Sequence, residues 1–190
     1  MALSYADAEQ ALSAALAALD GPDDHIADRL EALPLPVYVT GPDGVVTHFN
    51  SACVDFAGRA PTAGRDRWCV TWRLFHEDGA PMPHDQCPMA VTIRERREVR
   101  GLRAVAELPD GSRRAFEPFP TPLYDEQGAF AGAVNLLLEL TPDSRIAELE
   151  QQARKCRRLA TGISDEATVA RLNSMADQYD GEARRLRDQG

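Results

Sequence analysis

Residues 122–141 constrain the fold of this chain more than any other part of the sequence. Within them, residues 133–138 form the run Ala-Val-Asn-Leu-Leu-Leu, which is too apolar for an exposed edge strand and predicts a central strand. The preceding sequence Asp-Glu-Gln-Gly at 125–128 predicts a tight turn, because Gly128 can adopt positive φ without steric cost. The segment therefore predicts an antiparallel hairpin that leads into the charged sequence beyond Pro142.

The rest of the chain contains further strand patterns. Asn50 is placed to cap a helix that ends near Gly58, directly after a strand–turn–strand pattern. Residues 99–108 alternate apolar and polar side chains, as a half-buried strand does. In the segment that follows, Pro118, Pro120 and Pro122 limit hydrogen bonding, so parts of that strand are expected to be irregular. The predicted strands lie near residues 36–40, 44–49, 99–108, 113–123 and 130–140.

These patterns together resemble a PAS domain over residues 27–141. The resemblance rests on the order strand, Asp-Gly turn, strand, Asn-x-Ala and helix in residues 36–58, and on the terminal Glu-Leu-Thr of residues 139–141. Residues 60–86, with two tryptophans, resemble one PAS subgroup with a Trp-rich loop. The resemblance implies an α+β fold in which a five-stranded antiparallel sheet carries helices on one face.

The sequence also predicts helical extensions at both ends of residues 27–141. Residues 1–26 form an Ala-rich N-terminal extension, with a helix over 4–20 and Asp23 or Asp24 as the cap of a second helix. Residues 142–190 form a C-terminal extension with two heptad-like seams separated by Gly162. We expect helices near 142–160 and 165–187 that fold back on each other as a hairpin.

An apolar stripe on the N-terminal helix has two interpretations. Leu12, Leu16 and Leu19 lie on one helical face. The stripe either packs on its own domain or forms a homodimer contact, because a small helix with an apolar face needs a partner surface.

Composition excludes several classes of function. The 30 acidic and 21 basic residues give a net charge of -9, which argues against nucleic-acid binding. No apolar run approaches the roughly 20 residues that span a bilayer, so no membrane insertion is expected. The N-terminus lacks the basic start of a secretory signal, which predicts a cytoplasmic protein whose four cysteines are free thiols.

No catalytic motif is recognisable in the chain. It contains no phosphate-binding glycine loop, HExxH helix or GxSxG elbow, and no attached catalytic region. We therefore expect no enzyme activity, and we interpret the chain as a free-standing regulatory module.

The resemblance implies an interior ligand pocket between the sheet and a helical lid, with ordinary core packing as the alternative. The flavin photosensor motif is absent, and residues 88–98 contain no histidine for haem, so no cofactor is expected and any small ligand is unknown. An unpaired Asn135 amide inside an apolar strand would be costly, so it pairs with backbone or faces a ligand or water. The candidate pocket residues are Val39, Trp72, Phe75, Met82, Met89, Ile93, Phe116, Asn135 and Leu137.

His84 and Cys87 form the basis of an alternative metal or haem site, with Cys69 and His76 nearby in the sequence. Their spacing matches no standard zinc signature. The competing interpretation is a loop in which Pro88 starts a helix and Cys87 is a small buried hydrophobe.

The function that the resemblance implies is regulation of a partner protein, such as a sensor kinase or a second-messenger enzyme, by protein–protein contact. Glu139, Leu140 and Thr141 join the sheet to the C-terminal helices, so a shift there would reorient those helices. We expect a homodimer. The alternatives are a sensor that captures haem or metal through His84 and Cys87, and a structural dimerisation adaptor.

Overall fold

The computed structural model describes residues 5–20 and 25–188. The chain divides into two compact units, and we treat each by itself. The sheet unit is Ala6–Glu139, and the tail unit contains Leu140–Gly190.

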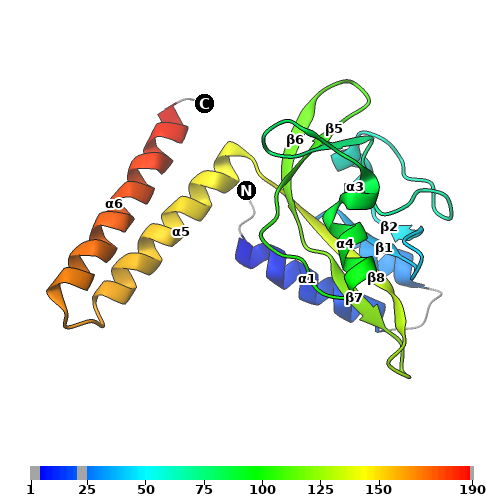
Figure 1. The fold of residues 1–190 in the computed structure, drawn as a ribbon, viewed down its shortest axis with the longest axis horizontal. Coiled ribbons are helices and arrows are strands. Elements are labelled where there is room, and N and C mark those ends of the chain that lie inside the picture. Colours follow the sequence, from blue (N-terminus) through cyan, green and yellow to red (C-terminus); the bar gives the residue numbers. More distant parts are fainter. Residues whose placement is uncertain (1–4, 21–24, 189–190) are drawn as a thin grey trace. The chain divides into compact units, whose positions relative to one another are not determined.

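The sheet unit contains an antiparallel sheet with eight strands, shown in Figure 1. Its strands are β1 (Val37–Thr40), β2 (Val46–Phe49), β3 (Arg73–Phe75), β4 (Pro81–Met82), β5 (Ala104–Glu107), β6 (Arg113–Pro118), β7 (Thr121–Tyr124) and β8 (Phe130–Glu139). The order is β2-β1-β8-β6-β5-β3-β4, and β7 also pairs with β8. β8 pairs with β1 on one side and with β6 and β7 on the other, which confirms the predicted central strand.

The prediction of five strands was wrong in number, although the fold class is confirmed. The predicted strand 113–123 is divided into β6 and β7 at Phe119 and Pro120, since proline has no N–H to donate. The second difference is the β3–β4 hairpin, which forms within residues 60–86, where the sequence resembled a Trp-rich loop, and which pairs with β5 through β3. These strands have three and two residues, too few for a periodic pattern to show in the sequence.

Two helices cover one face of the sheet. α3 (Ser51–Ala57) begins after Asn50, whose side chain accepts a hydrogen bond from the Cys53 N–H, and it ends at Gly58 in the left-handed conformation. α4 (Pro88–Glu95) begins with proline in its first turn, after the 3-10 helix η2 (His84–Gln86). These caps were predicted. A single buried core joins the two helices to the sheet and includes Tyr38, Phe56, Leu74, Met89, Phe116 and Leu137.

The other face of the sheet is covered as well. Side chains alternate along a strand, so Val37 and Leu136 face away from this core, yet both are fully buried. We assign their cover to α1 (Tyr5–Leu19), which buries Ala8 and Ala15 outside that core and runs alongside the sheet in Figure 1. α2 (Ile26–Glu31) follows His25, and the predicted caps at 23 and 24 lie outside the described residues.

The tail unit is a helical hairpin, as predicted. α5 (Pro142–Ala160) and α6 (Glu166–Asp188) pack through small side chains at Ala153, Cys156 and Ala176. Ion pairs also join the helices: Arg145 with Glu182, Arg157 with Asp177 and Asp180, and Arg187 with Glu150. In the described part of the chain, no helix combines the length and the apolar character needed to cross a membrane.

Candidate ligand site

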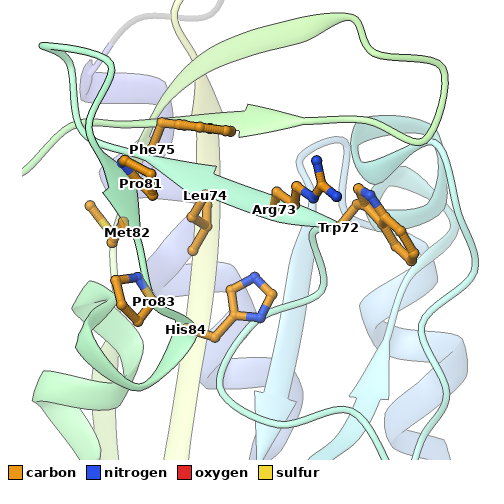
Figure 2. Close-up of a pocket in the computed structure, with 8 residues that line it drawn as sticks. All are labelled: Trp72, Arg73, Leu74, Phe75, Pro81, Met82, Pro83 and His84. Carbon is orange, nitrogen blue, oxygen red and sulfur yellow. The ribbon is translucent and has the colours of Figure 1, made fainter.

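The β3–β4 hairpin and η2 line an open pocket of about 490 Å³, shown in Figure 2. Figure 2 shows the Leu74 side chain pointing from β3 toward the space between Met82 and His84. Trp72 stands at one end of the hairpin, and 51% of its surface is exposed. The complete lining is Trp72, Arg73, Leu74, Phe75, Pro81, Met82, Pro83 and His84. The walls are therefore mainly apolar.

A second pocket of about 220 Å³ adjoins the first, because both include Trp72 and His84 in their lining. Its other lining residues are Arg59, Asp66, Arg67, Cys69 and Thr71. Arg59 forms an ion pair with Asp66, and its Nε donates to the Val70 carbonyl at 3.1 Å. The smaller pocket is thus a polar compartment beside an apolar one.

His84 stands between the two pockets with an unused polar atom. Its Nε2 is buried and has no hydrogen-bond partner among the described residues. Burial lowers the pKa of His84, and the positive charge of Arg59 lowers it further. The imidazole is therefore neutral at neutral pH, with one ring nitrogen free to bond a ligand.

A polar network lies inside the core, on the strands β1 and β8. Tyr38 of β1 lies directly opposite Asn135 of β8. The Asn135 Nδ2 donates to the Tyr38 hydroxyl at 2.9 Å, and that hydroxyl donates to the Trp68 carbonyl at 2.9 Å. Burial raises the pKa of Tyr38 well above its ordinary value, so the hydroxyl keeps its proton.

Two features of this network carry an energetic cost. Asn135 is only 2% exposed, and its Oδ1 has no hydrogen-bond partner within the described residues. Trp68, which supplies the carbonyl, has a φ of 63°, in the left-handed region that non-glycine residues seldom adopt. Strained and unpaired groups of this kind occur preferentially at functional sites.

The structure does not bring the predicted pocket residues together at one place. Trp72, Phe75 and Met82 line the open pocket. Met89, Phe116 and Leu137 belong to the buried core, Ile93 packs against it, and Asn135 lies among them on β8. Val39 is buried, but it follows Tyr38 on β1 and therefore faces the opposite side of the sheet.

The residues proposed for the alternative metal or haem site have different structural roles. The Cys87 sulfur accepts a hydrogen bond from the Ala90 N–H at 3.5 Å and so caps α4, whereas His84 lines the pockets. Cys69 Sγ lies 3.1 Å from Thr71 Oγ1, and all four cysteines are buried free thiols. The described residues contain no group of three or more His, Cys, Asp or Glu side chains placed to hold a metal ion.

The structure also places the predicted junction residues 139–141 and the leucines of the N-terminal helix. Glu139 ends β8 and pairs with Arg114 of β6 at 3.7 Å. Thr141 caps α5, because its Oγ1 accepts a hydrogen bond from the Ser144 N–H at 3.1 Å, and Leu140 connects the two. On α1, Leu12 is buried within the chain, whereas Leu16 and Leu19 remain partly exposed.

Several residues of these sites were missed in the sequence. Tyr38 occurs in a predicted strand, but its pairing with Asn135 depends on a register that the sequence does not reveal. Arg59 and Asp66 lie in the segment without periodicity, so no signal linked them to His84. The one available signal was the polar amide of Asn135 within an apolar run.

Comparisons with known proteins place this geometry in context. A protein-family model described as PAS fold matches residues 30–145. No curated protein matches the chain. Among solved structures, the PAS domain of the fruit-fly ELK potassium channel has 12% identity and a TM-score of 0.50, with 64% of this chain and 99% of that chain covered. A Rhodobacter sphaeroides LOV protein has 11% identity and a TM-score of 0.46, with 96% and 99% covered.

Proposed function

The chain belongs to the PAS fold family, and we propose that it is a signalling module that regulates a partner protein by direct contact. PAS domains are generally non-catalytic sensor modules, which sets the class of function. The partner that we propose is a signalling enzyme in the cytoplasm, such as a sensor kinase or a second-messenger enzyme.

The observation that carries this proposal is the unpaired Oδ1 of Asn135 in the middle of β8. A buried carbonyl oxygen without a donor costs about 1–3 kcal/mol. A small ligand or a water molecule that donated a hydrogen bond to it would recover part of that free energy. Asn135 is therefore a position in the core that is sensitive to what occupies its surroundings.

β8 also provides the route from the core to the helices. Glu139 lies four positions after Asn135 on β8, and Thr141 then caps α5. We propose that a change at Asn135 alters the pairing of β8 with β6 near Glu139, and that the first turn of α5 responds. The α5–α6 hairpin would be the surface that the partner contacts.

Replacing Asn135 with leucine separates signalling from stability. We expect the free energy of unfolding to change by no more than about 1 kcal/mol, because the substitution removes the unpaired Oδ1 but also the hydrogen bond that Nδ2 donates to Tyr38. Signal output should change. A photoreactive amino acid at the exposed position Met175 of α6 would capture the partner in the source cell, and the yield of captured signalling enzyme should change about twofold or more in Asn135→Leu.

His48→Gln is the matched control, because His48 lies on the edge strand β2 and outside the core. It should leave both the stability and the capture yield unchanged. Equal capture yields in the wild type and Asn135→Leu would contradict the proposed role of Asn135. Capture of only a second copy of this chain would replace the proposal with the structural dimerisation adaptor.

We also propose that the protein is a homodimer through α1. Leu12 is 8% exposed and is already used within the chain, whereas Leu16 and Leu19 on the same helix are partly exposed. Two leucines on an exposed helical face favour burial against another copy, since each gains roughly 1.5–3 kcal/mol when fully buried.

The double variant Leu16→Glu/Leu19→Glu should therefore be monomeric at micromolar concentration, where the wild type is a dimer by light scattering. Two unpaired charges in an apolar interface are strongly unfavourable. Leu102→Glu, at a half-exposed position of the sheet unit, should leave the mass unchanged. A monomeric wild type would refute the dimer. A double variant that stays dimeric would show that the interface does not include this face of α1.

A further inference from the structure

The two adjoining pockets beside the β3–β4 hairpin differ in chemistry and meet at Trp72 and His84. The larger pocket, about 490 Å³, falls within the range of small-molecule sites, and its walls are an indole, aliphatic side chains and two prolines. The smaller one adds charged and hydroxyl side chains. Such a double compartment suits a ligand with an apolar body and one polar end.

The charged groups that line the pockets favour a negative polar end. Three arginines, Arg59, Arg67 and Arg73, face a single lining carboxylate, Asp66. Asp66 is occupied, because it pairs with Arg59 and accepts a hydrogen bond from the Thr62 N–H at 3.0 Å. Arg67 pairs with the exposed Asp43 at 3.7 Å, and Arg73 pairs with Glu107 of β5 at 3.3 Å, but neither of these carboxylates lines the pockets. The lining therefore carries an excess of positive charge.

His84 supplies a hydrogen-bonding position at the boundary of the two compartments. Its Nε2 is buried and lacks a partner in the described structure. A buried polar nitrogen that forms no hydrogen bond is costly, and an acceptor on a ligand would satisfy it when that nitrogen carries the proton. Trp72, half-exposed beside it, offers a flat apolar surface on which a ligand can lie.

We propose that this double pocket binds a small amphipathic carboxylate, whose apolar body lies between Trp72 and Leu74 and whose carboxylate accepts a hydrogen bond from His84 Nε2. The site goes beyond the proposed function. It involves neither the partner nor Asn135, and it is built on the hairpin that extends the sheet past β5.

Binding should be linked to proton uptake at His84. In the free protein, burial and Arg59 lower the pKa of His84, while Asp66 and Asp85 raise it. A bound carboxylate would add a negative charge beside the ring and so raise that pKa. Because the bound state then holds the proton more tightly than the free state, affinity should increase as the pH falls through the interval between the two pKa values.

Three probes of one shape test the proposal: 4-phenylbutyrate, its neutral amide and the corresponding phenylalkyl ammonium. Each would be titrated into the full chain while the indole N–H signals of Trp68 and Trp72 are followed by NMR. We expect the Trp72 signal to shift and the carboxylate to bind about tenfold more tightly than the amide. The preference should be larger at about pH 6 than at about pH 8.

Two variants and one control locate the site. His84→Gln should reduce the preference for carboxylate over amide, because only the lining arginines would then favour the charge, and it should remove the pH dependence with the amide affinity retained. Trp72→Ala, at a half-exposed position that tolerates truncation, should weaken both probes. His48→Gln, at the opposite edge of the sheet, should change nothing. Equal affinities for the three probes, a preference for the ammonium, or no binding at millimolar concentration would each overturn the proposal.

Discussion

Asn50→Ala should lower the free energy of unfolding of the sheet unit by about 3–5 kcal/mol, the sum of a lost helix cap and several unpaired buried backbone groups. Asn50 is 1% exposed. Its Oδ1 accepts hydrogen bonds from the Val37 N–H at 3.1 Å and the Cys53 N–H at 3.2 Å. The two N–H groups of its Nδ2 are shared among three carbonyl groups, that of Leu35 at 2.8 Å and those of Leu30 and Leu33 at 3.3 Å.

Alanine can replace none of these bonds, so α2, β1 and α3 would lose the side chain that joins them. Urea unfolding followed by tryptophan fluorescence measures the loss, because both tryptophans belong to the sheet unit. Asn173→Ala makes the same substitution at an exposed position inside α6 and should be neutral or slightly stabilising, since alanine is the better helix former. A loss below about 1 kcal/mol for Asn50→Ala would mean that water replaces the amide.

The sequence predicted only part of what Asn50 does. Its role as a helix cap follows from a local rule, and that prediction is confirmed. The contacts of its Nδ2 with the carbonyls of Leu30, at the end of α2, and of Leu33 and Leu35, in the turn that follows, depend on a segment that contains no periodic signal. Helix caps could be predicted because they depend on neighbouring residues in the sequence, whereas contacts between segments far apart in the sequence could not.

The same distinction explains the outcome for the strands and the candidate site. The apolar run of β8 is long enough to predict a central strand, while β3 and β4 are strands through pairing across the fold, β3 with β5 and β4 with β3. Trp72, Phe75 and Met82 were predicted for a pocket between the sheet and a helical lid, whereas the pocket that they line lies at the β3–β4 hairpin. Asn135 was selected as a costly amide, but its bond to Tyr38 required knowledge of the register.

Gly132→Ala is expected to destabilise the sheet unit by about 3 kcal/mol or more, because two costs combine at this position. Gly132 has a φ of 140°, which L-residues rarely adopt. A Cβ there would overlap the carbonyl oxygen of Thr40 and lie 3.0 Å from the carbonyl carbons of Thr40 and Gly41. These atoms are backbone, so they cannot rotate away, and β1 would have to separate from β8.

Gly128→Ala in the same hairpin isolates the conformational cost from the steric one. Gly128 also has positive φ, at 77°, but a Cβ there meets nothing within 4 Å. This variant should lose only about 1 kcal/mol. The measurement is the midpoint of urea unfolding, with the exchange of the Asn135 amide protons as a local readout of β8. Equal stabilities of Gly132→Ala and Gly128→Ala would contradict the steric cost at Gly132. They would mean that β1 can move away from β8 there at no cost in free energy.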